Sequence, residues 1–192
     1  MLSVSGQPKM VSNRPFRPSS RRFARFRSDQ SGASALEFAI LAGPLILLLL
    51  AIIQLGLVYF SNYTLESALE RGARLIRTGQ AHTQGFDATK FKNEVCKYMS
   101  APLRCSELRL DVRSYPSFAG AANNITSPFG DDGKLKSDFS FDPGEAEDVV
   151  VVRAFYPLDI GSVLPSSINL SNMEESGDRL LVATAAFRNE PF

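Results

Sequence analysis

The residues best placed to do chemistry lie where a basic tail meets an apolar run: Gly32, and Glu37 five positions later. Hydrolysis of the peptide bond after Gly32 would leave a new α-amine on Ala33. Because positions i and i+4 share one face of a helix, this amine can pair with Glu37 of its own chain or of a neighbouring subunit. Cleavage at this bond would therefore give a product whose amine and carboxylate can neutralise each other.

A carboxylate at the mouth of an apolar helix needs a partner or another reason to be there. An acidic side chain costs about 2.5–3.5 kcal/mol at the centre of a membrane and less near its edge. Two opposite charges can be buried in an assembly only if they pair. A simpler alternative stays open, in which Glu37 is a tolerated carboxylate at the membrane interface and Gly32 is a flexible residue of the tail.

The apolar run is long enough to cross a membrane. Residues 38–53 include no charged or strongly polar side chain, and the wider stretch 33–60 is broken only by Ser34, Glu37 and Gln54. A helix rises about 1.5 Å per residue, so about 20 residues span the hydrocarbon core. We therefore expect a transmembrane helix over 33–60. Aromatic residues gather where its outer interface should lie, at Tyr59, Phe60 and Tyr63.

Charge is distributed in blocks along the chain. Residues 1–32 carry seven basic side chains and one acidic, residues 33–60 carry only Glu37, and residues 61–192 have a net charge of −4. Basic residues before a span keep that end in the cytoplasm, so the chain should contact a lipid bilayer and place its C-terminal domain across it. A nucleic-acid partner is not expected, because the folded part has no basic excess. The basic residues that set this topology are Arg21, Arg22, Arg25 and Arg27.

Two other interpretations of the apolar run are weaker. A removed secretory signal has an apolar region of about 7–15 residues that ends in small residues, whereas this run is longer and ends in the bulky residues 57–60. A core helix of a small soluble domain would not be apolar all round, as residues 45–53 are. Inside the span, Gly43 and Pro44 predict a helix kink, because proline removes one backbone hydrogen bond.

Helical periodicity continues beyond the span. Apolar residues recur at spacings of three, four or seven over 59–77, and Gly79 is a suitable C-terminal stop. A second helix is expected over about 88–100, with Asp87 as its N-cap. We therefore expect the membrane helix to continue outwards as a helical extension, followed by a separate helix of the exported domain.

The two cysteines, Cys96 and Cys105, both follow the apolar run. In an exported segment such a pair predicts a disulfide. The bridge would close a loop of about ten residues and contribute roughly 2.5–3 kcal/mol in the chain-entropy model. Metal binding is a poor alternative, because two thiols with no nearby histidine cannot complete a tetrahedral site.

Three strands are expected in the exported domain. Residues 107–115 alternate, with Leu108, Leu110 and Val112 on one face and charged residues on the other, which is typical of a half-buried strand. A second, central strand is expected over 148–156, stopped by Pro157, and a third over 179–188. Segments 116–147 and 159–178 are predicted to be loops, the first with a short hairpin at Phe139 and Phe141.

The predicted fold class is α+β: a long N-terminal transmembrane helix extends into a small exported domain, in which a helix packs on a short antiparallel sheet. The expected division is a basic cytoplasmic leader at 1–32, the transmembrane helix at 33–60, a helical extension at 61–80 and the exported domain at 81–192.

Motifs for nucleotide binding, metalloprotease, hydrolase or thiol-redox chemistry do not occur in the sequence. His82 lies in a polar stretch and is expected to be a solvated loop residue rather than a base. The acidic residues of 131–148 lack the alternation of a calcium-binding loop. We therefore expect no metal, no cofactor and no enzymatic activity.

The junction at residues 31–39, SGASALEFA, resembles the processing site of type IV prepilins, in which a basic leader ends in Gly and Glu is the fifth mature residue. Ala33 departs from the Phe or Met that such sites often have after the Gly. With Pro44 shortly after it, the run is similar to the TadE-like family of pseudopilins of the tight-adherence (Flp pilus) secretion system. Residues 68–79 and 183–192 also resemble this family.

The resemblance implies a minor pilin or pseudopilin whose residues 1–32 are removed by a prepilin peptidase, and which acts in pilus biogenesis, adhesion or secretion. Its implied partners are other pilin-like subunits and inner-membrane platform proteins of the same system. It implies a single-pass inner-membrane protein with a periplasmic domain that becomes pilus-associated after processing. The alternative is an uncleaved, membrane-anchored envelope protein that acts as a scaffold or binding module; an exported enzyme is less favoured still.

Overall fold

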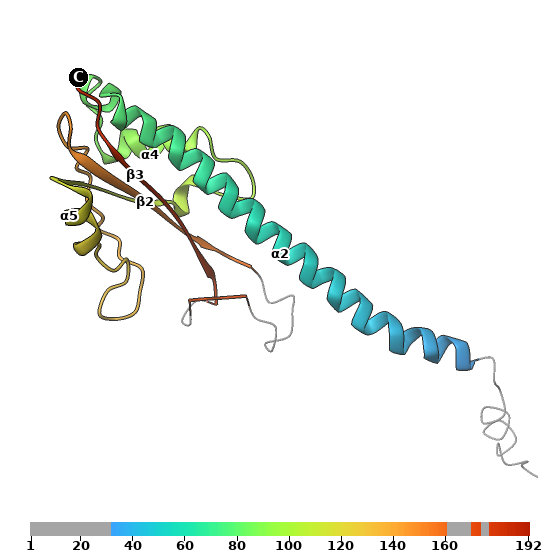
Figure 1. The fold of residues 1–192 in the computed structure, drawn as a ribbon. Helices are drawn as coiled ribbons and strands as arrows, with labels where there is room; N and C mark the ends of the chain where they lie inside the picture. The colour runs from blue at the N-terminus through green and yellow to red at the C-terminus, as the bar shows by residue number, and fades with distance from the viewer. Residues whose placement is uncertain (1–31, 161–169, 174–176) are drawn as a thin grey trace, which may run out of the picture. The chain divides into compact units, whose positions relative to one another are not determined.

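The computed structural model describes residues 32–160, 170–173 and 177–192 of the 192-residue chain. The chain forms two compact units, Met1–Leu45 and Ile46–Phe192, which meet inside the first helix. A long apolar helix is followed by a small domain with helices and a three-stranded antiparallel sheet, which confirms the predicted α+β class (Figure 1). In chain order the elements are α2 (Ala33–Arg77), α3 (Gln80–Thr83), α4 (Ala88–Cys96), η2 (Cys105–Glu107), β1 (Arg109–Tyr115), α5 (Phe118–Asn123), β2 (Val149–Leu158) and β3 (Arg179–Arg188).

The end of α2 is fixed by Gly79, as the sequence predicted. The helix ends at Arg77, and Gly79 adopts a left-handed conformation with φ of 72° and donates its N–H to the carbonyl of Ile76 at 2.9 Å. Glycine adopts this conformation without the steric cost that a Cβ imposes. A Cβ on Gly79 would also collide with the ring of Phe192, so the position has no room for a side chain.

Helix α4 is shorter at its C-terminus than expected. Its N-cap is Asp87, whose side chain accepts from the N–H of Lys90 at 2.7 Å, as predicted. The helix ends at Cys96 rather than near residue 100. Beyond Cys96 the chain winds in tighter turns, with the N–H of Tyr98 bonded to Val95 and that of Met99 to Cys96. These i to i−3 bonds replace the α-helical pattern, which is common in a last turn.

Strand β2 is the central strand, as predicted, with the order β1-β2-β3 and antiparallel pairing throughout. The predicted stop at Pro157 is wrong, because β2 continues through Pro157 to Leu158. The carbonyl of Asp148 accepts a hydrogen bond from the N–H of Asn189, just beyond β3. Successive residues of a strand direct their backbone groups to opposite neighbours, so even-numbered residues of β2 face β3 and odd-numbered ones, such as Pro157, face the β1 side. The β1 pairing ends at Phe155, so the N–H that proline lacks would have had no strand to bond.

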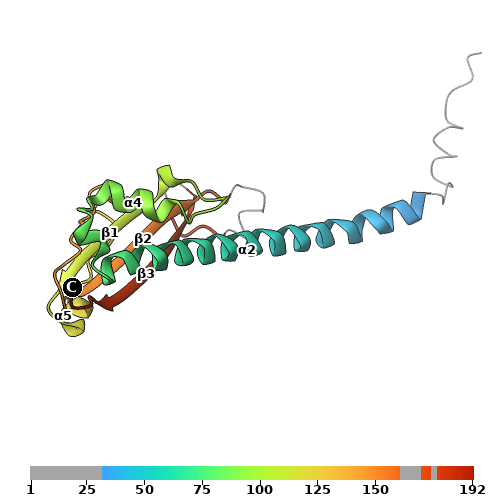
Figure 2. The ribbon, with the colours of Figure 1, turned by 90° about the horizontal axis from the view of Figure 1, so that it is seen from above.

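Both faces of the sheet are covered along β2. On one face Val150 and Val152 belong to a core that includes Leu65 and Leu69 of α2 and Phe91 of α4. In Figures 1 and 2, α2 and α4 run over the same face of the sheet. On the other face, Val149 and Val151 pack with Ala121 of α5. Burial on both sides explains why this strand has four consecutive valines instead of an alternating pattern.

The segment 116–147 forms the cover of the outer face. The structure has no hairpin at Phe139 and Phe141 among the residues it describes: Phe141 instead forms a parallel bridge with Val112 on the edge of β1. The ring of Phe139 stacks on that of Phe155, with centroids 5.2 Å apart. Contacts between distant parts of the chain therefore organise this segment, and local turn residues alone do not specify it.

A buried ion cluster ties this cover to the sheet. The Asp111 carboxylate, 1% exposed, accepts from Arg153 Nη2 at 2.6 Å, from Arg113 Nε at 3.1 Å and from the N–H of Ser140 at 3.1 Å. Burial by itself would raise the pKa of Asp111, but the hydrogen bonds from Arg153, Arg113 and Ser140 outweigh it and hold the pKa below its ordinary value. Arg153 also donates to the carbonyl of Thr126 at 2.8 Å.

Candidate functional site

Gly32 lies immediately before α2, which begins at Ala33, and it is exposed. A Cβ added to Gly32 would meet no atom within 4 Å, and its φ lies outside the left-handed region. The fold therefore does not require a glycine here, in contrast to Gly79.

Glu37 lies in the second turn of α2, exposed among large apolar side chains that are also exposed. Within the described part of the chain, Glu37 has no ion-pair partner. Helical side chains lean toward the N-terminus, so the carboxylate of Glu37 projects over the turn that begins at Ala33. The helix therefore places Ala33 and Glu37 at the i and i+4 positions that the pairing requires.

The first part of α2 presents an apolar surface on all sides. This helix is long and apolar enough to cross a membrane, and no residue of its most apolar stretch is buried. Gly43 and Pro44 lie inside it, and α2 continues through both without a break in its assignment. The arginines expected to set the topology, Arg21, Arg22, Arg25 and Arg27, lie outside the described residues. Exposed large side chains on this surface include Leu41, Leu45, Ile46, Leu48, Ile52 and Ile53.

The domain already contacts α2 at Gln54, inside the segment that we predicted to span the membrane. Gln54 Nε2 donates to the carbonyl of Ile160 at 2.9 Å, and Val58 is buried in the domain core. Ser61 is fully buried and donates to the carbonyl of Leu57 at 2.7 Å. The exposed part before Gln54, residues 33–53, has a length of about 31 Å at 1.5 Å per residue. That length matches the roughly 30 Å hydrocarbon core.

The contact of Gln54 with Ile160 was not predicted. Its one sequence signal is that Gln54 is the only amide side chain in the apolar run, and such a residue needs a hydrogen-bond partner where it is buried. The predicted interface aromatics Tyr59, Phe60 and Tyr63 are exposed on α2, one to three turns further on.

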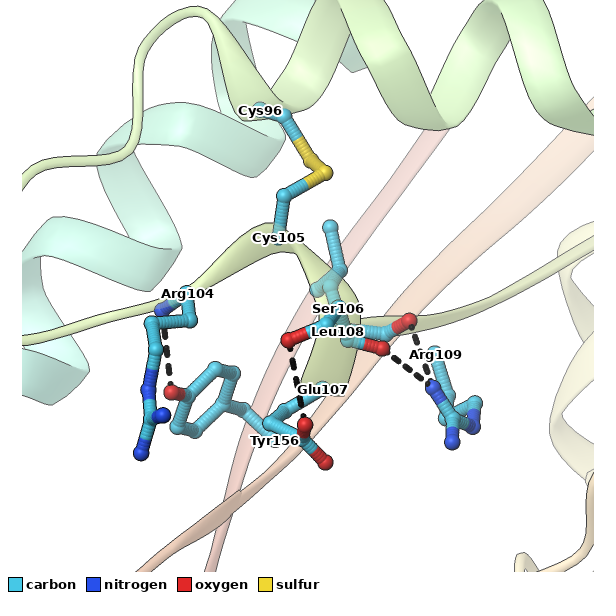
Figure 3. The surroundings of a disulfide bond; sticks show 8 residues. All are labelled: Cys96, Arg104, Cys105, Ser106, Glu107, Leu108, Arg109 and Tyr156. Carbon is cyan, nitrogen blue, oxygen red and sulfur yellow. Dashed lines mark hydrogen bonds between the residues drawn. A yellow bond between two sulfur atoms is a disulfide. The ribbon is translucent and has the colours of Figure 1, made fainter.

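The disulfide joins Cys96 to Cys105, the pairing predicted from the sequence, with a Cα–Cα distance of 5.6 Å. It connects the end of α4 to η2, the turn that leads into β1 (Figure 3). Beside it, the N–H of Arg104 donates to the Tyr156 hydroxyl of β2 at 3.0 Å. The bridge thus anchors α4 to the sheet, and it is a structural element of the domain.

His82 lies in the short helix α3, not in the loop that we expected, and it is exposed. Its Nε2 is 3.4 Å from Glu145, and its ring lies 5.8 Å from that of Phe192. Several acidic side chains of 131–148 accept backbone N–H groups in turns, as Asp132 does from Lys134 and Asp148 does from Glu145. Over the ranges that the structure describes, no three His, Cys, Asp or Glu side chains converge in a way that could hold a metal ion.

Part of the chain matches the model of a known protein family. The family described as TadE-like protein matches residues 32–74, from the glycine that precedes α2 to a point within its last turn. Neither a curated protein nor a solved structure matches the chain. The matched segment contains Gly32, Glu37, the apolar surface and Gln54. Over this segment, less than a quarter of its length, the chain is similar to the TadE-like family.

Proposed function

We propose that the protein is a minor pilin or pseudopilin of a tight-adherence (Flp) pilus, and that a prepilin peptidase cleaves it between Gly32 and Ala33. The observation that carries this proposal is the glycine itself. Gly32 stands directly before the first helical residue, where the fold places no demand on its side chain or its backbone. Specificity of a peptidase for a small residue would account for it.

Cleavage would complete the chemistry at the start of α2. The α-amine released on Ala33 pairs with Glu37, so the helix end loses its uncompensated negative charge. In the bilayer the apolar surface of 33–53 contacts lipid, and in a fibre it contacts the same surface of other pilin-like subunits. Movement between the two exchanges one apolar environment for another, and packing and charge pairing then decide the outcome.

In this account the N-terminus faces the cytoplasm and the domain lies in the periplasm. The basic leader supports this orientation, and an oxidising compartment suits the Cys96–Cys105 disulfide. Partners would be the prepilin peptidase, other pilin-like subunits and inner-membrane platform proteins of the same system. The domain, which holds α2 from Gln54 onwards, would act in biogenesis of the fibre, in adhesion or in secretion.

A pair of matched glycine variants tests the processing step. Gly32→Val should retain the leader in cells that produce the peptidase, because the substituted residue no longer fits the cleavage site. Gly56→Ala is the control, since a Cβ at Gly56 also meets nothing within 4 Å but lies far from the junction. It should be cleaved as the wild type is. Two outcomes would contradict the proposal. In one, Gly32→Val is cleaved as fully as Gly56→Ala; in the other, the wild type and Gly56→Ala both keep the leader, which would favour the uncleaved envelope scaffold.

A further inference from the structure

A pocket of about 290 Å³ lies between α2 and the start of β3. Its apolar wall includes Leu55 and Val58 of α2 and Val182 of β3. Its polar lining residues are Tyr59, Asn62 and Arg179. The lining therefore combines an apolar surface with polar residues, and the described part of it includes no carboxylate.

The pocket lies where α2 leaves the proposed membrane span. From Leu55 to Asn62 the helix rises by about 10 Å, and its side chains change from apolar to polar over that distance. Arg179 pairs with Leu158, two residues before the Ile160 carbonyl that Gln54 contacts. Arg179 is therefore at the end of the domain nearest to the proposed span, where lipid headgroups would lie.

Among the described residues that line this pocket, Arg179 is the one that carries a charge. Its Nη1 donates to the carbonyl of Leu170 at 2.7 Å, and this bond uses one of the five N–H donors of the guanidinium. The planar fork of arginine matches the geometry of a phosphate group, which it binds through two donors at once. Asn62 donates to Glu66 at 2.7 Å, one turn further from the span, so the anion would bind toward Arg179.

We infer that this pocket binds the headgroup of an anionic phospholipid in the leaflet from which the domain emerges. The phosphate contacts Arg179, and the glycerol and first methylene groups lie against Leu55 and Val58. The apolar wall distinguishes this ligand from free phosphate, which would gain nothing from it. The inference rests on the proposed membrane anchorage and is independent of cleavage at Gly32.

Because the chain has no tryptophan, one introduced indole reports on its own surroundings alone. Tyr59→Trp places it in the pocket, at a side chain that is 69% exposed and so tolerates the change. The full chain is reconstituted in two sets of phosphatidylcholine vesicles. One contains a small fraction of brominated phosphatidylglycerol and the other the same fraction of brominated phosphatidylcholine, with the bromines close to the glycerol in both. Fluorescence quenching then measures which lipid is enriched beside residue 59.

We expect the brominated phosphatidylglycerol to be enriched about tenfold over its bulk fraction, and Arg179→Gln to abolish the enrichment. Arg188→Gln, at the other end of the same strand, should leave it unchanged. Ile53→Trp, on the lipid-facing surface and outside the pocket lining, should be quenched equally by both lipids. Equal quenching of Tyr59→Trp by both lipids, or enrichment that survives Arg179→Gln, would overturn the inference. If the protein does not float with the vesicles, it is not anchored in the membrane, and the inference, which depends on that anchorage, is overturned as well.

Discussion

Gln54 of α2 donates a hydrogen bond to the backbone carbonyl of Ile160 at 2.9 Å, although 106 residues separate the two in the sequence. This bond joins the apolar run of α2 to the domain. None of the side chains of 33–53 is buried, whereas Val58 and several later residues of α2 belong to the domain core.

Thiol labelling can locate this boundary in membranes. Leu48→Cys should resist a membrane-impermeant thiol reagent, because residue 48 lies in the proposed hydrocarbon-spanning segment. Tyr63→Cys, at a side chain that is 70% exposed on the domain part of α2, should react fully. The native cysteines form a disulfide and do not compete. Labelling at both positions in intact vesicles would show that the helix is not embedded up to Gln54.

The Asp111–Arg153 pair should contribute strongly to stability, because both side chains are buried. Asp111→Ala leaves the Arg153 charge without its carboxylate, and such losses cost about 3–5 kcal/mol. Replacement of both partners by apolar residues should cost less than Asp111→Ala alone. Urea denaturation of the full chain in detergent measures the stability of the wild type, of Asp111→Ala and of the double variant. Wild-type stability of Asp111→Ala would show that the pair contributes nothing.

The same carboxylate predicts how stability depends on pH. The pKa of Asp111 is lower in the folded protein than its ordinary value of about 3.9 in an unfolded chain. Its contribution is therefore complete above about pH 4 to 5 and is lost as the pH falls through the lower, folded pKa. Asp111→Asn should remove this part of the acid dependence. Thermal unfolding between pH 7 and pH 2 checks the prediction, and parallel curves for wild type and variant would contradict it.

Loss of the disulfide should destabilise the domain without changing its fold. Cys96 and Cys105 are nine positions apart, and a loop of this size accounts for about 2.5–3 kcal/mol in the chain-entropy model. The double variant Cys96→Ser/Cys105→Ser should lower the denaturation midpoint, and reduction of the wild type should reproduce the shift. A reductant that further destabilises the double variant would indicate a different cause.

Gly79 and Gly85 form a matched pair for the end of α2. Both have positive φ, 72° and 57°, but a Cβ meets the Phe192 ring at Gly79 and open space at Gly85. Gly85→Ala should cost about 1–2 kcal/mol, the cost of a left-handed residue with a Cβ. Gly79→Ala should cost more, and the added Phe192→Ala substitution should recover the difference. Equal effects at the two glycines would show that Phe192 does not restrict Gly79.

Glu37→Gln separates assembly from cleavage. It preserves the size of the side chain and the cleavage site at Gly32, so the peptide bond should still be hydrolysed. The variant cannot neutralise the α-amine of Ala33, and we expect at least about a tenfold loss of assembled protein, which corresponds to about 1.4 kcal/mol. Quantification of the protein in sheared fibre fractions checks this, with Glu66→Gln, a second exposed carboxylate on α2, as the control.

Local patterns in the sequence were sufficient for much of the fold. Strand β3 has the predicted bounds, Arg179–Arg188, and Asp87 and Gly79 act at the helix ends as expected. These features depend on residues close in the sequence. The continuation of β2 through Pro157 depends instead on where β1 ends, which no local pattern in β2 records.

Contacts over long sequence distances account for what the sequence did not reveal. Alternation in β1 indicated that Asp111 faces away from the core, but the structure buries it because segment 116–147 returns to cover that face. The contact of Gln54 with Ile160 has the same origin. Glu37 is the opposite case: its residue type and position were evident, while the group that we propose as its partner forms only after cleavage.

The most direct test of the central claim is the intact mass of the protein extracted from membranes of cells that produce an active prepilin peptidase. We expect a single species that begins at Ala33 and retains the disulfide. A chain that still carries residues 1–32 in those cells, or one that begins at any other residue, would contradict the account.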